Sequence, residues 1–125
     1  MLMVGTQHGL YTTDLHNTST WRRIVAKNIV SLDFGLDPNL IYWTDGKRTN
    51  RFSMHNGVNE DIPFGYDDVT SVEDLAVDWI RDKLYWSDAT HDGIYIGDLP
   101  SGRRVKIIDK NLDSPRAIVV NPSDG

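Results

Sequence analysis

Residues 41–45 read Ile-Tyr-Trp-Thr-Asp, and the pattern returns 43 residues later as Leu-Tyr-Trp-Ser-Asp at residues 84–88. The residues that lead into the two blocks keep this spacing, because Leu32 falls on Leu75 and, one period later, on Ile118. A fixed period of this length is typical of repeat architectures, in which each repeat forms one small structural unit.

An earlier copy of the repeat is also recognisable. Residues 9–15 (Gly-Leu-Tyr-Thr-Thr-Asp-Leu) match residues 93–99 (Gly-Ile-Tyr-Ile-Gly-Asp-Leu). Residues 23–29 then match residues 106–112 at nearly the same spacing, with the small slippage confined to polar, turn-rich stretches. Two long matches in register indicate that the repeat is real.

Within one period the sequence predicts short strands separated by turns. The predicted strands are β-branched or aromatic runs at residues 75–77, 84–86, 93–96 and 105–108. Asp-Gly, Leu-Pro-Ser-Gly and Asp-Ser-Pro sequences at 92–93, 99–102 and 113–115 mark the turns. Four strands in about 40 residues indicate one blade of an all-β propeller. A β-sandwich is the main competing fold, but it gives no reason for a repeat every 43 residues.

The aromatic blocks are interpreted as structural. In a strand, Tyr42 and Thr44 face one way while Trp43 and Asp45 face the other. Large flat side chains suit the wedge between twisted sheets, and an aspartate at a strand end can accept N–H bonds from the following turn or the next blade. A carboxylate that recurs in every repeat is unlike a catalytic one, which occurs once. The predicted motif residues are Tyr42, Trp43, Thr44 and Asp45, with Tyr85, Trp86, Ser87 and Asp88 in the second copy.

The two blocks, together with Leu75-Ala76-Val77-Asp78-Trp79 ahead of the second, closely resemble the YWTD (LDL-receptor class B) repeats. The segment Ser114–Pro122 is similar to the lead-in of that family, with Asn121 at the place that matches Asp78. The resemblance covers nearly the whole chain. It implies blades of a six-bladed propeller, as in the LDL receptor, the epidermal growth factor precursor and nidogen.

The repeat divides the chain into three units. Residues 1–40 are predicted to be a degenerate first blade, residues 41–83 a second blade, and residues 84–125 a third. The next block would begin two residues beyond Gly125. We therefore expect about three four-stranded blades of a six-bladed ring, so that the chain is a fragment whose partners include the remaining blades.

Composition excludes several classes of function. The chain has 125 residues and a net charge of −5, which argues against binding to a nucleic-acid backbone. No apolar run is long enough to span a bilayer, so no membrane contact is expected from this segment. The absence of cysteine removes disulfides, thiolate metal sites and cysteine nucleophiles. No catalytic residue, cofactor or metal site is predicted, because no phosphate loop, nucleophile elbow or metalloprotease motif is present.

Two kinds of polar residue are candidates for a functional role. Asn17-Thr18-Ser19 is a possible N-glycosylation site. The histidines His8, His16, His55 and His91 lie in predicted turns and read most simply as solvated loop residues. Histidine titrates between neutral and endosomal pH, so they are also candidates for pH sensing, an idea that the LDL-receptor resemblance implies through ligand release in acidic endosomes.

Three acidic pairs, Glu60-Asp61, Asp67-Asp68 and Glu73-Asp74, lack the alternating spacing and the glycine of a calcium loop. They are interpreted as solvated loop charges.

The resemblance implies a non-enzymatic, extracellular binding or scaffold module, part of the propeller of an LDL-receptor-related endocytic receptor. Its partners would be protein ligands and flanking EGF-like modules, at the cell surface. Two alternatives stay open: a matrix or growth-factor-precursor propeller similar to nidogen, and a metal-dependent hydrolase of another six-bladed class, whose metal would need convergent Glu, Asn and Asp side chains.

Overall fold

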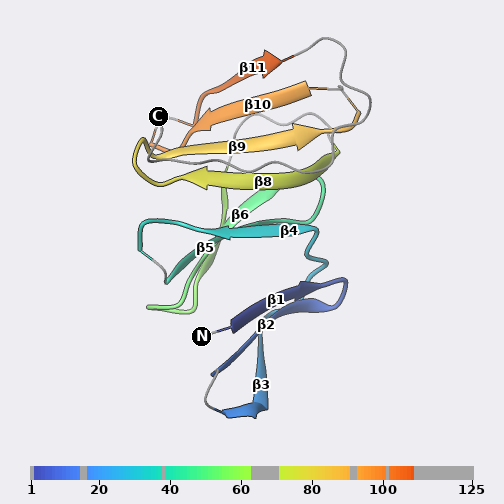
Figure 1. The fold of residues 1–125 in the computed structure, drawn as a ribbon, viewed down its shortest axis with the longest axis vertical. Coiled ribbons are helices and arrows are strands. Elements are labelled where there is room, and N and C mark those ends of the chain that lie inside the picture. Colours follow the sequence, from blue (N-terminus) through green and yellow to red (C-terminus); the bar gives the residue numbers. More distant parts are fainter. Residues whose placement is uncertain are drawn as a thin grey trace.

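The computed structural model describes residues 2–14, 17–37, 39–62, 71–90, 93–100 and 102–108. These residues form three antiparallel sheets stacked face to face (Figure 1), with no helix among them. The first sheet consists of β1 (Leu2–Thr6), β2 (Gly9–Asp14) and β3 (Asn17–Val25). The second consists of β4 (Ser31–Phe34), β5 (Leu40–Thr44), β6 (Thr49–Ser53) and β7 (Asn59–Ile62). The third consists of β8 (Val72–Asp78), β9 (Lys83–Asp88), β10 (Gly93–Asp98) and β11 (Arg104–Ile108).

The second and third sheets are built alike. Each has its four strands in chain order, with the aromatic block on the second strand, β5 or β9. The registers also agree, because Leu32 lies opposite Trp43 and Leu75 lies opposite Trp86. The all-β fold and its propeller blades, predicted from the repeat, are confirmed.

The first sheet departs from the prediction of a four-stranded blade. Its first described strand, β1, already takes the place of β5 and β9, so the described residues hold no counterpart of β4 or β8 in this sheet. The sheets are also offset from the sequence repeat by one strand. Each four-stranded sheet begins with the lead-in strand β4 or β8, whereas the predicted units at 41–83 and 84–125 begin with β5 or β9. Those unit boundaries stay a prediction about the repeat.

Two apolar clusters hold the stack together, one on each side of the second sheet. The cluster between the first and second sheets contains Leu10, Val25, Ile29, Ile41, Trp43 and Phe52. The cluster between the second and third sheets contains Tyr42, Ile62, Val72, Leu75, Val77, Leu84 and Trp86. Successive residues of a strand point to opposite faces, so Trp43 packs against the first sheet while its neighbour Tyr42 packs against the third.

A backbone hydrogen bond recurs at each junction between sheets. The Ile29 N–H donates to the Thr6 carbonyl at 2.9 Å, and the Val72 N–H donates to the Gly46 carbonyl at 2.6 Å. Ile29 and Val72 are 43 residues apart, so both bonds join the end of one block to the start of the next sheet. Gly5 allows the first of these approaches, because a Cβ there would collide with the side chain of Ile29.

Among the described residues, no helix is long and apolar enough to cross a membrane.

Candidate functional site

The two block tryptophans occupy corresponding positions. Trp43 on β5 and Trp86 on β9 are both fully buried and face the preceding sheet. The Trp43 Nε1–H donates to the Asn59 Oδ1 at 2.8 Å. Trp86 instead stacks on Tyr95 of the neighbouring strand, with ring centroids 5.6 Å apart. Both indoles therefore serve packing between sheets.

The tyrosines of the blocks differ in burial. Tyr42 is 5% exposed because the third sheet covers it. Tyr85, on the face of β9 away from the second sheet, is only half-buried. The same motif position is therefore core in one sheet and partly accessible in the other.

The polar ends of the blocks organise turns. The Asp45 carboxylate accepts the N–H groups of Lys47 and Arg48, both at 2.9 Å. The buried Asp88 carboxylate accepts the Thr90 N–H at 2.9 Å and the Ser71 N–H at 3.3 Å. Asp88 thus ties its turn to the segment entering β8 of its own sheet, and none of these bonds reaches a neighbouring sheet. Thr44 is fully buried, and its hydroxyl donates to the Arg48 carbonyl at 2.7 Å; Ser87 is equally buried.

Asp78 ends β8 with a buried carboxylate. It accepts the backbone N–H groups of Ile80 and Arg81 at 3.2 Å and the Arg81 guanidinium at 3.0 Å. Burial of the carboxyl group favours a higher pKa, but the Arg81 side chain and the two N–H donors outweigh it, and the pKa of Asp78 lies below its ordinary value of 3.8. Asp78 is therefore an ionised group that fixes the β8–β9 turn.

Of the four histidines, the described residues include two. The His55 Nε2 lies 2.7 Å from the Asp37 Oδ2, and both side chains are substantially exposed, at 59% and 40%. The Asn39 backbone N–H and the His55 side chain hold the pKa of Asp37 below its ordinary value of 3.8. His8 is exposed and lies 3.3 Å from the Gln7 amide. pH sensing by these two residues stays a prediction.

The remaining candidates are only partly covered. His16 and His91 lie outside the described residues, as does Asn121. Asn17 begins β3, but its side chain is outside the described part, so glycosylation there stays a prediction.

Two of the three acidic pairs, Glu60-Asp61 and Glu73-Asp74, lie on strands rather than in loops. Glu60 and Asp61 belong to β7, and Glu60 forms an ion pair with Arg51 at 2.7 Å. Asp74 lies on β8 and accepts a hydrogen bond from the Ser31 hydroxyl of the second sheet. The expectation that these residues lie in loops is wrong, because strand edges and sheet junctions also use carboxylates. The expectation that they are solvated holds for Glu60 and Asp61, which are exposed. Asp67 and Asp68 lie outside the described residues.

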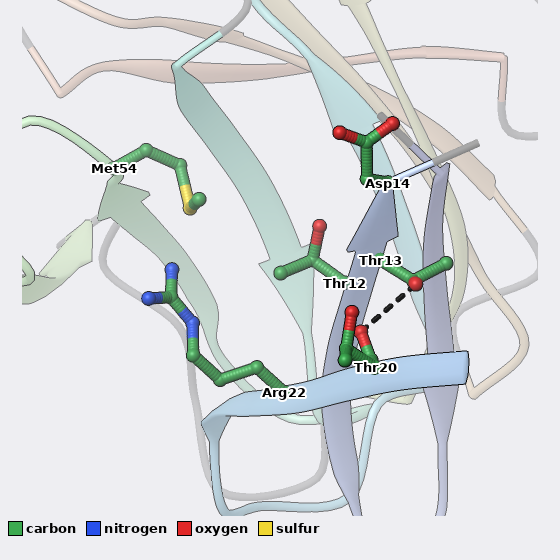
Figure 2. A pocket seen from close by; sticks show the side chains of 6 residues that line it. All are labelled: Thr12, Thr13, Asp14, Thr20, Arg22 and Met54. Atoms are coloured by element: carbon green, nitrogen blue, oxygen red, sulfur yellow. Dashed lines mark hydrogen bonds between the residues drawn. The ribbon is translucent and has the colours of Figure 1, made fainter. Parts of the chain in front are cut away.

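A small polar cavity of about 350 Å³ opens beside β2, β3 and the end of β6. Figure 2 shows the Arg22 guanidinium extending toward Met54, away from the Asp14 carboxylate. The Thr13 hydroxyl donates to the Thr20 carbonyl at 2.9 Å, a bond that links β2 to β3. The threonine hydroxyls Thr12 and Thr13 are thus occupied with backbone carbonyls.

A larger groove of about 450 Å³ lies between the second and third sheets, where the β4–β5 and β8–β9 turns meet. The groove was not among the predicted sites, although Leu36 and Trp79 on its rim are 43 residues apart, a spacing that places them on equivalent turns of the repeat. It is lined by Gly35, Leu36, Asp37, Leu40, Tyr42, Val77, Trp79 and Asp82.

In the part of the chain that the structure describes, no three His, Cys, Asp or Glu side chains gather as a metal site would require. The arrangement that the structure does provide is a rigid stack of sheets with turns at its edges. Such a frame can present surfaces for recognition.

Comparison with known proteins agrees with this architecture. The family model described as low-density lipoprotein receptor repeat class B matches residues 82–122. Low-density lipoprotein receptor-related protein 5 of Mus musculus is 35% identical over 132 aligned residues, which cover 100% of this chain and 8% of that protein. The chain therefore spans a small part of this relative.

Solved structures show the same fold. A chain in the crystal structure of a nidogen–laminin complex superposes with a TM-score of 0.85 and 23% identity, over 98% of this chain and 49% of that one. The Cps50 (Swd1) β-propeller domain of Myceliophteria thermophila gives a TM-score of 0.70 and 15% identity, over 96% and 43% of the two chains. With the repeat match, the relative and the stacked blades taken together, the chain belongs to the β-propellers built from LDL-receptor class B (YWTD) repeats.

Proposed function

We propose that this chain is part of a non-enzymatic, extracellular binding module of an LDL-receptor-related endocytic receptor. The observation that carries the proposal is the 35% identity to the receptor-related protein along the whole chain. The roles of the recurring polar residues support a scaffold rather than a reaction centre. Thr44, Asp78 and Asp88 are all buried, and all form hydrogen bonds with backbone groups of nearby turns. Asp78 also forms an ion pair with the Arg81 side chain of its own turn.

The partners of such a module would be proteins, held by surface complementarity at the turns, with flanking EGF-like modules in the same protein. Release of a ligand at acidic pH is part of the proposal. The pair formed by His55 and Asp37 supports it, because histidine is the residue type commonly used in pH-dependent switches and the His55 ring lies 2.7 Å from the Asp37 carboxylate. On this proposal, acidification weakens binding at that edge of the sheets.

An antibody uptake experiment on cells that express the full protein carrying this chain tests the assignment. Antibody raised against the chain is bound to intact, chilled cells, which are then warmed. Surface labelling followed by internalisation is the expected result. Antibody retained outside the cells in the matrix would favour the alternative similar to nidogen. Labelling only after permeabilisation would overturn the extracellular assignment.

A further inference from the structure

The groove between the second and third sheets has an apolar rim that is open to solvent. Leu36, on the β4–β5 turn, is 73% exposed, and Trp79, on the β8–β9 turn, is 44% exposed. Tyr42 and Val77, which also line the groove, are 5% and 4% exposed. Both turns lie at the same edge of the stack, the left edge in Figure 1. Two large, exposed apolar side chains therefore border one hollow, an arrangement unlike apolar residues scattered singly over a surface.

The charge of the groove has one sign. Asp37 and Asp82 line it from the two different turns, and no lysine or arginine is among its described lining residues. Arg81 and Lys83, the cations on either side of Asp82 in the sequence, form ion pairs with Asp78 and Asp98 respectively. Among the described residues the Asp82 carboxylate has no partner, whereas Asp37 has His55 at 2.7 Å.

Hydrogen bonds hold the two residues that carry these carboxylates. Asp82 adopts a left-handed conformation with φ of 58°, which aspartate and asparagine tolerate better than most residues. Its own carbonyl accepts the Leu99 N–H at 3.1 Å. Asp37 accepts the Asn39 N–H at 2.9 Å. A ligand would therefore meet two carboxylates on turns that hydrogen bonds already hold.

We propose that this groove docks an extended segment of a protein partner, with an apolar side chain between Leu36 and Trp79 and a lysine or arginine against Asp37 and Asp82. In an extended segment, side chains two positions apart lie on the same face. The recognised pattern is thus an apolar residue, any residue, and a basic residue. The inference rests on the proposed binding function and names the chemistry of the partner.

The test is a titration of the isotope-labelled 125-residue chain followed by nuclear magnetic resonance. The four tryptophans provide separate indole N–H signals, of which Trp79 borders the groove and Trp43 and Trp86 are buried internal controls. The probe is the capped peptide Ser-Leu-Ser-Lys-Ser. The matched controls are Ser-Leu-Ser-Glu-Ser, with reversed charge, and Ser-Gly-Ser-Lys-Ser, without the apolar side chain.

The expected result is a saturable shift of the Trp79 signal with the lysine peptide and at most a weak one with either control. Asp82→Asn keeps the shape and the tolerance for the left-handed backbone but removes one charge. It should weaken binding by about threefold, as expected for an exposed charge pair. Asp61→Asn is the control, because Asp61 is exposed on β7, does not line the groove, and loses the same charge.

Equal binding of the lysine and glutamate peptides, or equal loss in Asp82→Asn and Asp61→Asn, would overturn the proposal, as would no shift of Trp79. Binding of the lysine peptide that moves Trp21 rather than Trp79 would overturn it too. None of these results affects the uptake experiment, so failure of the groove and failure of the proposed receptor function are separable.

Discussion

The two junctions between sheets use the same motif but are built differently. Between the second and third sheets, the lead-in strands β4 and β8 lie side by side (Figure 1), and polar groups cross directly. The Val77 N–H donates to the Asp33 Oδ2 at 2.9 Å, and the Ser31 hydroxyl bonds to Asp74. Between the first and second sheets, the described residues provide no such strand on the first sheet. That junction depends on the apolar cluster around Trp43 and on the bond from Ile29 to Thr6.

The difference shows what the lead-in strand contributes to a blade. Aromatic wedges alone can hold two sheets face to face, since burial of a large aromatic side chain is worth several kcal/mol and does not require one exact register. The lead-in strand adds directional hydrogen bonds between sheets. These bonds fix how each blade is turned relative to the next.

The largest expected effect comes from removing each of the two tryptophan side chains packed between sheets, Trp43 and Trp86. Trp43→Ala and Trp86→Ala should each cost about 3–5 kcal/mol of folding free energy, because each leaves a cavity in a closed core. Hydrogen exchange measured by mass spectrometry separates the two. Trp43→Ala should accelerate exchange mainly in β1–β3, and Trp86→Ala mainly in β8–β11. Uniform acceleration of exchange over all three sheets in either variant would show that the two junctions between sheets do not open separately.

The two turns at the groove differ in the burial of their capping carboxylates, and this predicts a pH effect. Asp78 is buried and Asp37 exposed. Asp78→Asn should cost about 1–3 kcal/mol at neutral pH, because the ion pair with Arg81 is lost in a buried site. Asp37→Asn serves as the control and should cost much less. The measurement is urea unfolding at neutral pH.

The sign of the pH dependence follows from the lowered pKa of Asp78. Its stabilising contribution is present above the ordinary value of 3.8 and is lost as the pH falls through the lower pKa of the folded state. Unfolding by urea should therefore give the same contribution from Asp78 at neutral and endosomal pH, with the loss confined to below about pH 4. A difference between wild type and Asp78→Asn that already shrinks at endosomal pH would contradict this assignment.

A smaller effect is expected from the hydrogen bond between the Val77 N–H and the Asp33 carboxylate, which joins the third sheet to the second. Asp33→Ala leaves the N–H of the buried residue Val77 without its acceptor and should lower the free energy of unfolding by about 1–2 kcal/mol. Asp61→Ala, on an exposed edge strand, is the control. Faster exchange of the Val77 amide in Asp33→Ala alone is the expected outcome. Equal effects of the two substitutions would show that the bond adds nothing to the packing.

The smallest effect concerns the edge where both sheets form the groove. Asp37→Asn should weaken binding of the lysine peptide by about two- to fivefold at neutral pH, because it removes one of the two carboxylates that line the groove. Asp61→Asn is the control, and the shift of the Trp79 signal measures the affinity of both variants. Equal affinities in the two variants would show that Asp37 takes no part in binding.

The repeat made the strands and their stacking predictable, because a 43-residue period with turn residues at fixed places leaves few other folds. The role of the aspartates that end the blocks was also predictable from the local sequence. An aspartate before a turn readily accepts N–H bonds from that turn, as Asp45 does. The roles of Asp33 and Asp74 could not be predicted in this way. Each depends on a partner about 43 residues away in another sheet, and charge pairs in the sequence do not reveal such partners.

The amino-acid sequence by itself determined the all-β class, the positions of the four strands of the third sheet and of β5, and the burial of Trp43 and Trp86, because alternation and a fixed repeat can be read directly from the residues. Only the tertiary structure decided that the first sheet lacks a lead-in strand in its described part, that Asp37 meets His55, and that Leu36 and Trp79 flank one groove. These features arise where residues from different sheets converge. The relative placement of the sheets is set by packing over the whole stack rather than by any single segment.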